Sequence, residues 1–177
     1  MLKKILIVVA LIVIVLAIVA ALQPADFRIS RSATISAPPA VVFAQVNDLH
    51  KWEAWSPWAK IDPAMKRTYD GPPAGVGAVY KWVGNSEVGE GQLTITESRP
   101  NDLVGMKLEF VRPFACTNAV EFTLKPDGDK TAVTWGMTGR NNFMAKAAGL
   151  FMNMDKMVGG DFERGLANLE QVSAAAK

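Results

Sequence analysis

The chain has 177 residues, half of them apolar, and its 19 Lys and Arg against 17 Asp and Glu give a net charge of only +2. Lys3 and Lys4 account for this excess, so the rest of the chain is neutral and carries no basic run, which excludes an ordinary nucleic-acid binder. One cysteine excludes an internal disulfide, and one histidine with one cysteine excludes a zinc site built from ordinary His and Cys ligands.

The first predicted element is an apolar helix over residues 5–22. At a rise of 1.5 Å per residue it would span roughly 27 Å, close to the hydrocarbon thickness of a bilayer. We therefore expect residues 1–25 to be an N-terminal transmembrane anchor and residues 26–177 to form one domain. A cleaved signal peptide is the alternative, since Val19 and Ala21 could just form a small-residue cleavage site.

The lysines at the start bear on localisation. Lys3 and Lys4 precede the apolar run, and the positive-inside rule then favours an amino end in the cytoplasm and a domain outside it. The expected localisation is therefore that of a single-pass membrane protein.

Residues 27–63 contain three features in succession. The stretch 27–35 alternates apolar and polar residues, which predicts a strand. Residues 36–48 are predicted to form a helix with Val42, Phe43 and Val46 as its buried stripe. The two prolines near its start are tolerated in a first turn. The segment HKWEAWSPWAKIDP, residues 50–63, then holds three of the five tryptophans and the only histidine, and its two prolines leave room for at most one short helix.

Residues 65–140 have the texture of about six strands divided by turn residues. The clearest signal lies in residues 120–137, where apolar and polar side chains alternate on both sides of a Pro-Asp-Gly-Asp turn. This pattern is typical of a hairpin in an antiparallel meander with one apolar face.

The chain ends in a region where apolar residues recur every three or four positions, from Ala147 to Val172. The spacing predicts one helix of about 30 residues, which Gly159 and Gly160 could bend. Its partner surface would be the apolar face of the sheet. The predicted fold class is α+β, a curved antiparallel sheet around a long C-terminal helix.

This order of elements resembles the helix-grip fold of the START-like or SRPBCC superfamily, and in particular the membrane-anchored, polyketide cyclase/dehydrase-like proteins of bacteria. The resemblance covers Phe27 to Val172. It is carried by the blocks ISAPPAVVFAQVNDLHKWEAWSPW, DP at Asp62-Pro63, YDGPPAGVGAVYKWVGN, GEGQLTI and MDKMVGGDFERGLANL. The resemblance implies an apolar cavity between sheet and helix that holds a hydrophobic molecule, and a bacterial inner-membrane location.

Inward-facing aromatic and methionine side chains are the candidates for lining this cavity, since such residues suit an adaptable apolar site. The candidate ligand-binding residues are Trp55, Trp58, Tyr80, Trp82, Phe110, Phe122, Trp135, Met137, Met154 and Met157. For each of them simple core packing is an alternative. The tryptophans of residues 50–63 could also close the end of the core or dip into the bilayer surface.

Groups suited to catalysis are scarce. His50 and Cys116 could in principle pair as base and nucleophile, and Glu87, Glu90 or Asp70 could serve as a cavity acid or base. Nothing in the sequence orients any of them, and solvated surface positions are the simpler interpretation. We expect no metal site and no cofactor, because the carboxylates do not cluster and GVGAVY lacks the third glycine of a dinucleotide motif.

Three functions are compatible with these features. The leading hypothesis is a membrane-anchored START-like domain that binds a hydrophobic small molecule or lipid without chemistry. The first alternative is a polyketide cyclase or dehydratase, and the second is a protein-interaction module with a vestigial cavity. The sequence does not identify a protein partner.

Overall fold

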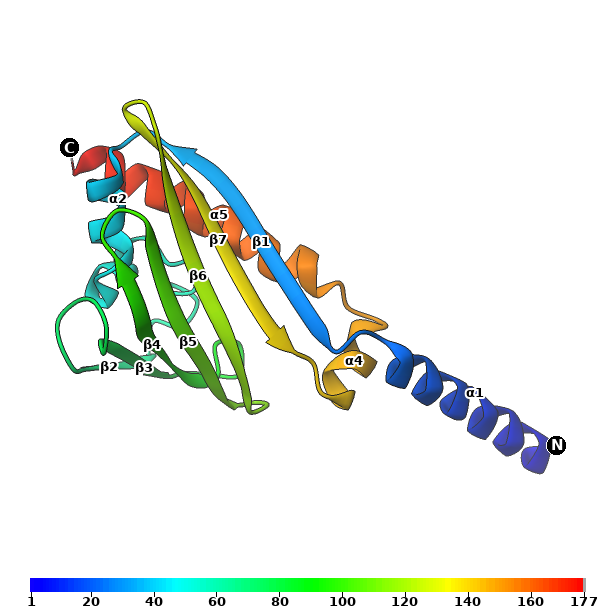
Figure 1. Ribbon diagram of the computed structural model, residues 1–177. Helices are drawn as coiled ribbons and strands as arrows, with labels where there is room; N and C mark the ends of the chain where they lie inside the picture. Colours follow the sequence, from blue (N-terminus) through cyan, green and yellow to red (C-terminus); the bar gives the residue numbers. More distant parts are fainter. Residues whose placement is uncertain (177) are drawn as a thin grey trace.

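The computed structural model describes residues 1–176 and consists of an apolar N-terminal helix followed by an α+β domain (Figure 1). A strand and three short helical segments come first in the domain, and six strands and two helices follow. The elements are α1 (Leu2–Leu22), β1 (Asp26–Ile35), α2 (Pro39–Val46), the 3-10 helix η1 (Leu49–Lys51), α3 (Trp52–Trp55), β2 (Lys66–Asp70), β3 (Val79–Val83), β4 (Glu90–Arg99), β5 (Leu103–Arg112), β6 (Cys116–Asp127), β7 (Lys130–Arg140), α4 (Phe143–Gly149) and α5 (Met154–Ala175).

Seven strands form one antiparallel sheet in the order β1-β7-β6-β5-β4-β3-β2. Strands β2 to β7 make a meander, and β1 completes the sheet beside β7. The pairing places Phe122 opposite Trp135 and Val120 opposite Met137, and all four side chains are buried. Figure 1 shows α5 lying along one face of this sheet. The predicted meander and the α+β helix-grip fold are therefore confirmed.

Helix α1 projects from the domain, as Figure 1 shows. It has 21 residues, and among residues 1–176 it is the one helix long and apolar enough to cross a membrane. Ala20 is its one buried residue, and its other apolar side chains are open to solvent. An anchor and a signal sequence share these properties.

The C-terminal region forms two helices, so the prediction of one helix of about 30 residues was wrong. Helix α4 ends at Gly149, and α5 begins at Met154. The side chain of Asn153 accepts a hydrogen bond from the backbone N–H of Lys156 at 2.9 Å, which satisfies one free donor at the start of α5. The break was missed because Leu150 and Phe151 continue the apolar spacing across it.

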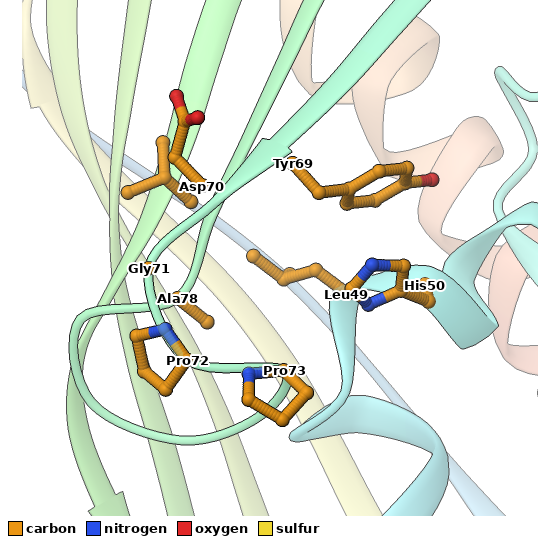
Figure 2. A pocket seen from close by; sticks show the side chains of 9 residues that line it. Leu49, His50, Tyr69, Asp70, Gly71, Pro72, Pro73 and Ala78 are labelled. Carbon is orange, nitrogen blue, oxygen red and sulfur yellow. The ribbon is translucent and has the colours of Figure 1, made fainter.

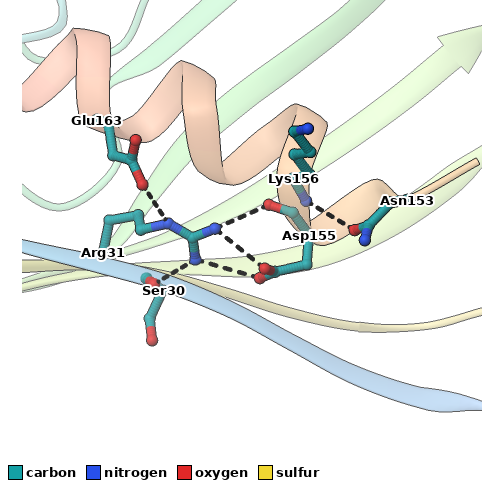
Figure 3. Close-up of polar contacts among 6 residues, drawn as sticks. All are labelled: Ser30, Arg31, Asn153, Asp155, Lys156 and Glu163. Atoms are coloured by element: carbon teal, nitrogen blue, oxygen red, sulfur yellow. Dashed lines mark hydrogen bonds and ion pairs between the residues drawn. The ribbon is translucent and has the colours of Figure 1, made fainter.

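Arg31 of β1 holds the start of α5 against the sheet (Figure 3). Its guanidinium donates to Asp155 Oδ2 at 3.0 Å, to the carbonyl of Asp155 at 3.0 Å and to Glu163 Oε1 at 2.7 Å. A Cβ on Gly159 would collide with this guanidinium. Gly159 therefore makes room for Arg31, and α5 continues through it without a break.

The contact between Arg31 and Asp155 predicts a pH dependence of stability. Hydrogen bonds from Arg31 lower the pKa of Asp155 below its ordinary value. A carboxyl whose pKa is lower in the folded chain stabilises the fold above its unfolded-state pKa, near 4, and this stabilisation is lost as the pH falls through the lower folded value. We expect Asp155→Asn to lower the melting temperature at neutral pH, with a difference from wild type that shrinks below about pH 4.

Thermal unfolding followed by circular dichroism at several pH values measures this difference. Asp129→Asn, in the turn between β6 and β7, is the control and should leave the melting temperature unchanged at neutral pH. An Asp155→Asn effect of the same size at every pH would contradict the prediction.

Gly165 lets α5 approach the sheet closely. A Cβ at this position would lie 2.5 Å from Trp135 Cζ3 and 3.1 Å from Pro57 Cδ. We expect Gly165→Ala to destabilise the fold by about 1–3 kcal/mol, because overpacking forces neighbours to shift. At Gly160 a Cβ meets nothing within 4 Å, so Gly160→Ala should stabilise the fold by about 0.5–1 kcal/mol through helix propensity. Urea denaturation measures the free energy of unfolding of the two variants. Equal changes for Gly165→Ala and Gly160→Ala would refute the close approach of α5 to the sheet at Gly165.

Candidate functional site

The tryptophan segment closes the end of α2. Trp52 Nε1 donates to the carbonyl of Val46 at 2.9 Å, and Trp55 Nε1 donates to the carbonyl of Gln45 at 3.3 Å. These carbonyls lie in the last turn of α2, where helical partners are missing. Both indoles are buried. The segment forms two short helical pieces, η1 and α3, where the sequence predicted at most one.

Six aromatic rings fill the region between the sheet and α5, with Trp135 of β7 at their centre. Trp135 stacks on Phe162 of α5 at a centroid distance of 4.2 Å and on Phe122 of β6 at 4.7 Å. Three tryptophans meet it edge-on, at 6.2, 5.8 and 5.7 Å: Trp52, Trp55 and Trp58. Aromatic pairs in such geometries contribute about 0.5–1.5 kcal/mol each beyond their buried area. This aromatic cluster therefore links α5 to β7 and to the tryptophan segment, beside the contacts that α5 makes with β1.

The indole N–H of Trp135 has no hydrogen-bond acceptor among residues 1–176. The side chain is 1% exposed. Buried N–H groups are nearly always paired, and leaving one unpaired costs about 1–3 kcal/mol. The aromatic cluster thus contains a free polar donor in otherwise apolar surroundings.

The structure places the ten predicted lining residues in three different environments. Five are buried in the core: Trp55, Trp82, Phe122, Trp135 and Met137. Three are half-buried and pack against that core: Trp58, Tyr80 and Phe110. Two are about half exposed: Met154 at 47% and Met157 at 51%.

Met154 and Met157 therefore stand apart from the aromatic cluster. The helical turn directs Asp155 toward Arg31 and Phe162 toward Trp135, which leaves the two methionines on the other side of α5. Apolar spacing suggested an inward position for them, because the spacing alone does not show which side of a helix meets the sheet.

A half-buried row of side chains on β3 and β5 packs against the same hydrophobic core. Tyr80, Leu108 and Phe110 form this row, and Trp82 contacts Tyr80 at 5.7 Å and Phe110 at 5.6 Å between ring centroids. Burial raises the pKa of Tyr80 above its ordinary value, so the phenol stays neutral near pH 7 and can donate or accept a hydrogen bond. Leu108 was absent from the predicted set, although its alternation with Lys107 and Glu109 already pointed it inward.

Trp58 borders the cluster at the side of α5. Its Nε1 donates to Asp161 Oδ2 at 3.1 Å, and its ring meets Phe162 at 6.3 Å. Asp161 is also held by Arg164 one turn later. Trp58 therefore links the loop after α3 to α5 at the margin of the buried rings.

A surface pocket lies elsewhere, beside η1 and the β2–β3 loop (Figure 2). The His50 ring stacks on Tyr69 at 4.0 Å, and its Nδ1 lies 3.3 Å from Asp48 Oδ1. Asp70 pairs with Lys81 at 2.6 Å, and Figure 2 shows its carboxylate directed away from the hollow. The pocket measures about 190 Å³, whereas ligand sites usually need about 300–1,000 Å³. It is too small for a lipid-sized molecule.

The remaining titratable candidates lie at the surface. Glu90 pairs with Arg112 at 2.6 Å, and Glu87 is exposed. Cys116 is exposed at the start of β6, whereas His50 lies beside β2 at one edge of the sheet. Within residues 1–176, no group of three His, Cys, Asp or Glu side chains could hold a metal ion.

Residues 26–174 match a protein family described as polyketide cyclase/dehydrase and lipid transport. The match begins at β1 and ends in α5, so it leaves out α1. Among curated proteins, none matches the chain.

Solved structures with the same fold cover most of the chain. Protein MLL2253 from Mesorhizobium loti has a TM-score of 0.63 at 17% identity, and TTHA0849 from Thermus thermophilus has a TM-score of 0.61 at 17% identity. Each match covers 85% of this chain and 99% of the other. The Aha1 dimer from Colwellia psychrerythraea has a TM-score of 0.54 at 16% identity, covering 84% of this chain and 95% of its own. At these identities the likeness shows the fold alone.

Proposed function

Because the chain belongs to the SRPBCC polyketide cyclase/dehydrase and lipid transport family, we propose that its domain binds a hydrophobic small molecule or lipid between the sheet and α5, without chemical conversion. The fold of this family commonly serves such binding. The site would comprise the aromatic cluster around Trp135 and the half-buried row of Tyr80, Leu108 and Phe110. Apolar area leaving water would supply the affinity, at about 25 cal/mol per Å².

The unpaired N–H of Trp135 is the observation that carries this proposal. A buried donor without an acceptor is costly, and a ligand that brings an ether, ester or carbonyl oxygen to Nε1 would recover that cost. The rings around it would hold the apolar part of the same molecule. The ligand class this favours is a largely apolar molecule with one or more hydrogen-bond acceptors.

We also propose that residues 1–25 anchor the domain of residues 26–177 in a membrane, and helix α1 supports this. Its 21 residues span about 31 Å as a helix, enough for the hydrocarbon layer. Lys3 and Lys4 at its start favour a cytoplasmic amino end. The anchor would keep the binding domain beside the bilayer that supplies or receives its ligand.

The cyclase or dehydratase alternative would need a titratable group inside the site. His50, Asp70 and Glu87 are exposed, and the half-buried Glu90 is paired with Arg112. Tyr80 is the titratable group in the half-buried row, and its raised pKa keeps it neutral near pH 7, which suits a hydrogen bond to a ligand better than work as a base. The protein-interaction alternative is favoured by one observation: exposed apolar side chains gather around α4, and such patches mark contact surfaces.

Native mass spectrometry of the full chain, purified in detergent without added ligand, tests the binding proposal. We expect extra mass in the range of a lipid or another apolar compound. Phe110→Ser should lower the fraction of protein that carries the bound compound. Trp135→Phe should lower it too, because this change removes the N–H and part of the ring.

Phe114→Ser is the matched control, because Phe114 follows the same strand but is 70% exposed. It should retain the extra mass. A bare mass for wild type, unchanged after incubation with lipid extracts, would refute the binding proposal and leave the interaction module as the better candidate.

A further inference from the structure

An exposed apolar patch covers α4 and the start of α5. We call it the α4 patch, and its members are Phe143, Met144, Phe151, Met152, Met154 and Met157. Each is a large apolar side chain with between 45% and 76% of its surface exposed. Large side chains that gather at one place on a surface mark a site of contact with another molecule or a membrane.

The α4 patch lies directly beside the C-terminal end of α1. Lys146 Nζ of α4 donates to the carbonyl of Ala21 at 3.4 Å, and the N–H of Asn141 donates to the carbonyl of Ala25 at 2.8 Å. Ala20, in the last turn of α1, is only 1% exposed. Figure 1 shows α4 at the point where α1 leaves the domain. Helix α4 therefore overlaps the last turn of the apolar helix.

This overlap identifies the molecule that covers the patch. If α1 spans the hydrocarbon layer, its last turn lies at the boundary between acyl chains and headgroups. Side chains packed beside that turn are then at the same depth. Amphipathic elements in this position bury their apolar faces about 5–10 Å into the boundary.

The charges near the patch fit a headgroup region. Lys146 and Lys156 belong to the same two helices. Arg140 ends β7 just before α4 and lies 3.9 Å from Asp26 Oδ1, in an exposed pair. Asp155, the acidic residue of the first turn of α5, is held by Arg31 on the side of the sheet. The cations that flank the patch can therefore face lipid phosphates.

We propose that the α4 patch is a bilayer-contacting surface, inserted among lipid headgroups beside α1. The proposal rests on the anchoring by α1 proposed above. It gives the domain a fixed orientation, because the membrane then holds it at two points, α1 and the patch. Arg31 then ties the patch to β1 through α5, so the sheet keeps a constant relation to the membrane.

Spin labels on the full chain test this surface. In a Cys116→Ser background, single cysteines would be introduced as Phe151→Cys in the patch, Val76→Cys in the β2–β3 loop and Val13→Cys in α1. Val76 is the control, because it is an exposed apolar residue outside the patch, 58% exposed against 76% for Phe151. The labelled proteins would be reconstituted in vesicles of phosphatidylcholine and phosphatidylglycerol, and collisions with a water-soluble nickel chelate would be measured.

We expect the labels at positions 13 and 151 to lose most collisions with the nickel chelate, while the label at position 76 keeps them. If position 13 is protected but position 151 collides as often as position 76, the bilayer surface is refuted and the anchor stands. If position 13 is also accessible, the anchor is refuted and this proposal fails with it. Spin–spin broadening between labels at position 151 would show that a second copy covers the patch, which would also overturn the proposal.

Discussion

Replacing Trp135 with alanine is expected to lower the free energy of unfolding by about 3–5 kcal/mol, the usual cost of removing a large buried aromatic ring. The ring is 1% exposed and lies between Phe122 and Phe162. Its removal would leave a cavity between the sheet and α5 and would abolish both stacking interactions, with Phe122 and with Phe162. Since a domain of this size is usually stable by about 5–15 kcal/mol, the loss would be a large share. Urea denaturation followed by far-ultraviolet circular dichroism measures it.

Two phenylalanine variants show whether the Trp135 N–H is unpaired. Trp135→Phe removes a donor that has no protein acceptor among residues 1–176, so only lost packing destabilises the variant. Trp52→Phe removes the donor to the carbonyl of Val46 and leaves that acceptor without its partner, which adds about 1–3 kcal/mol. Equal costs for the two variants would mean that the Trp135 N–H is paired after all, and the argument for a ligand with an acceptor would lose its basis.

The fold was predictable because its signals repeat along the chain. Alternation in residues 120–137 indicated the correct inward set, and the pairing of Phe122 with Trp135 confirms it. The single long helix was the main error. Asn153 caps the helix that begins after the break, and a local polar contact of that kind has no periodic signal.

The candidate site was predictable only in part. Aromatic residues at alternating strand positions were expected to face the helix, and they do so in the aromatic cluster. The sequence could not show that these rings fill the region, because ring stacking depends on how closely α5 approaches at Gly165. It also could not place Met154 and Met157, because Arg31 fixes the rotation of α5 through partners far along the chain.

These contacts connect binding and anchoring. Trp135 Nε1 is buried, so a ligand can reach it only if surrounding side chains move. Phe162, which stacks on Trp135, is carried by α5. The start of α5 is fixed to β1 by Arg31 and lies beside the α4 patch. If the α4 patch meets the bilayer, as proposed, α5 both carries a ring of the binding site and touches the membrane. Ligand exchange at Trp135 would then be coupled to the membrane through α5.

Deleting residues 2–22 is expected to move the protein from the membrane fraction to the soluble fraction. The apolar side chains of α1 are almost all exposed in the structure, and the deletion removes the segment that would be buried in the bilayer. Fractionation of expressing bacteria by ultracentrifugation measures the shift. A truncated protein that stays fully in the membrane fraction would show that α1 is not the main attachment. A wild-type protein already soluble and shortened at its amino end would show that α1 is a cleaved signal.

The single cysteine offers a test of which side of the membrane holds the domain. Cys116 is exposed, so in spheroplasts it should react with a membrane-impermeant maleimide if Lys3 and Lys4 keep the amino end in the cytoplasm. Cys116→Ser is the control for reaction at other groups. Labelling that appears only after lysis would place the domain in the cytoplasm and reverse the predicted orientation, while the anchoring itself would stand. In that case the ligand would have to come from the inner leaflet or the cytoplasm, because a domain held beside α1 can exchange molecules only with the side on which it lies.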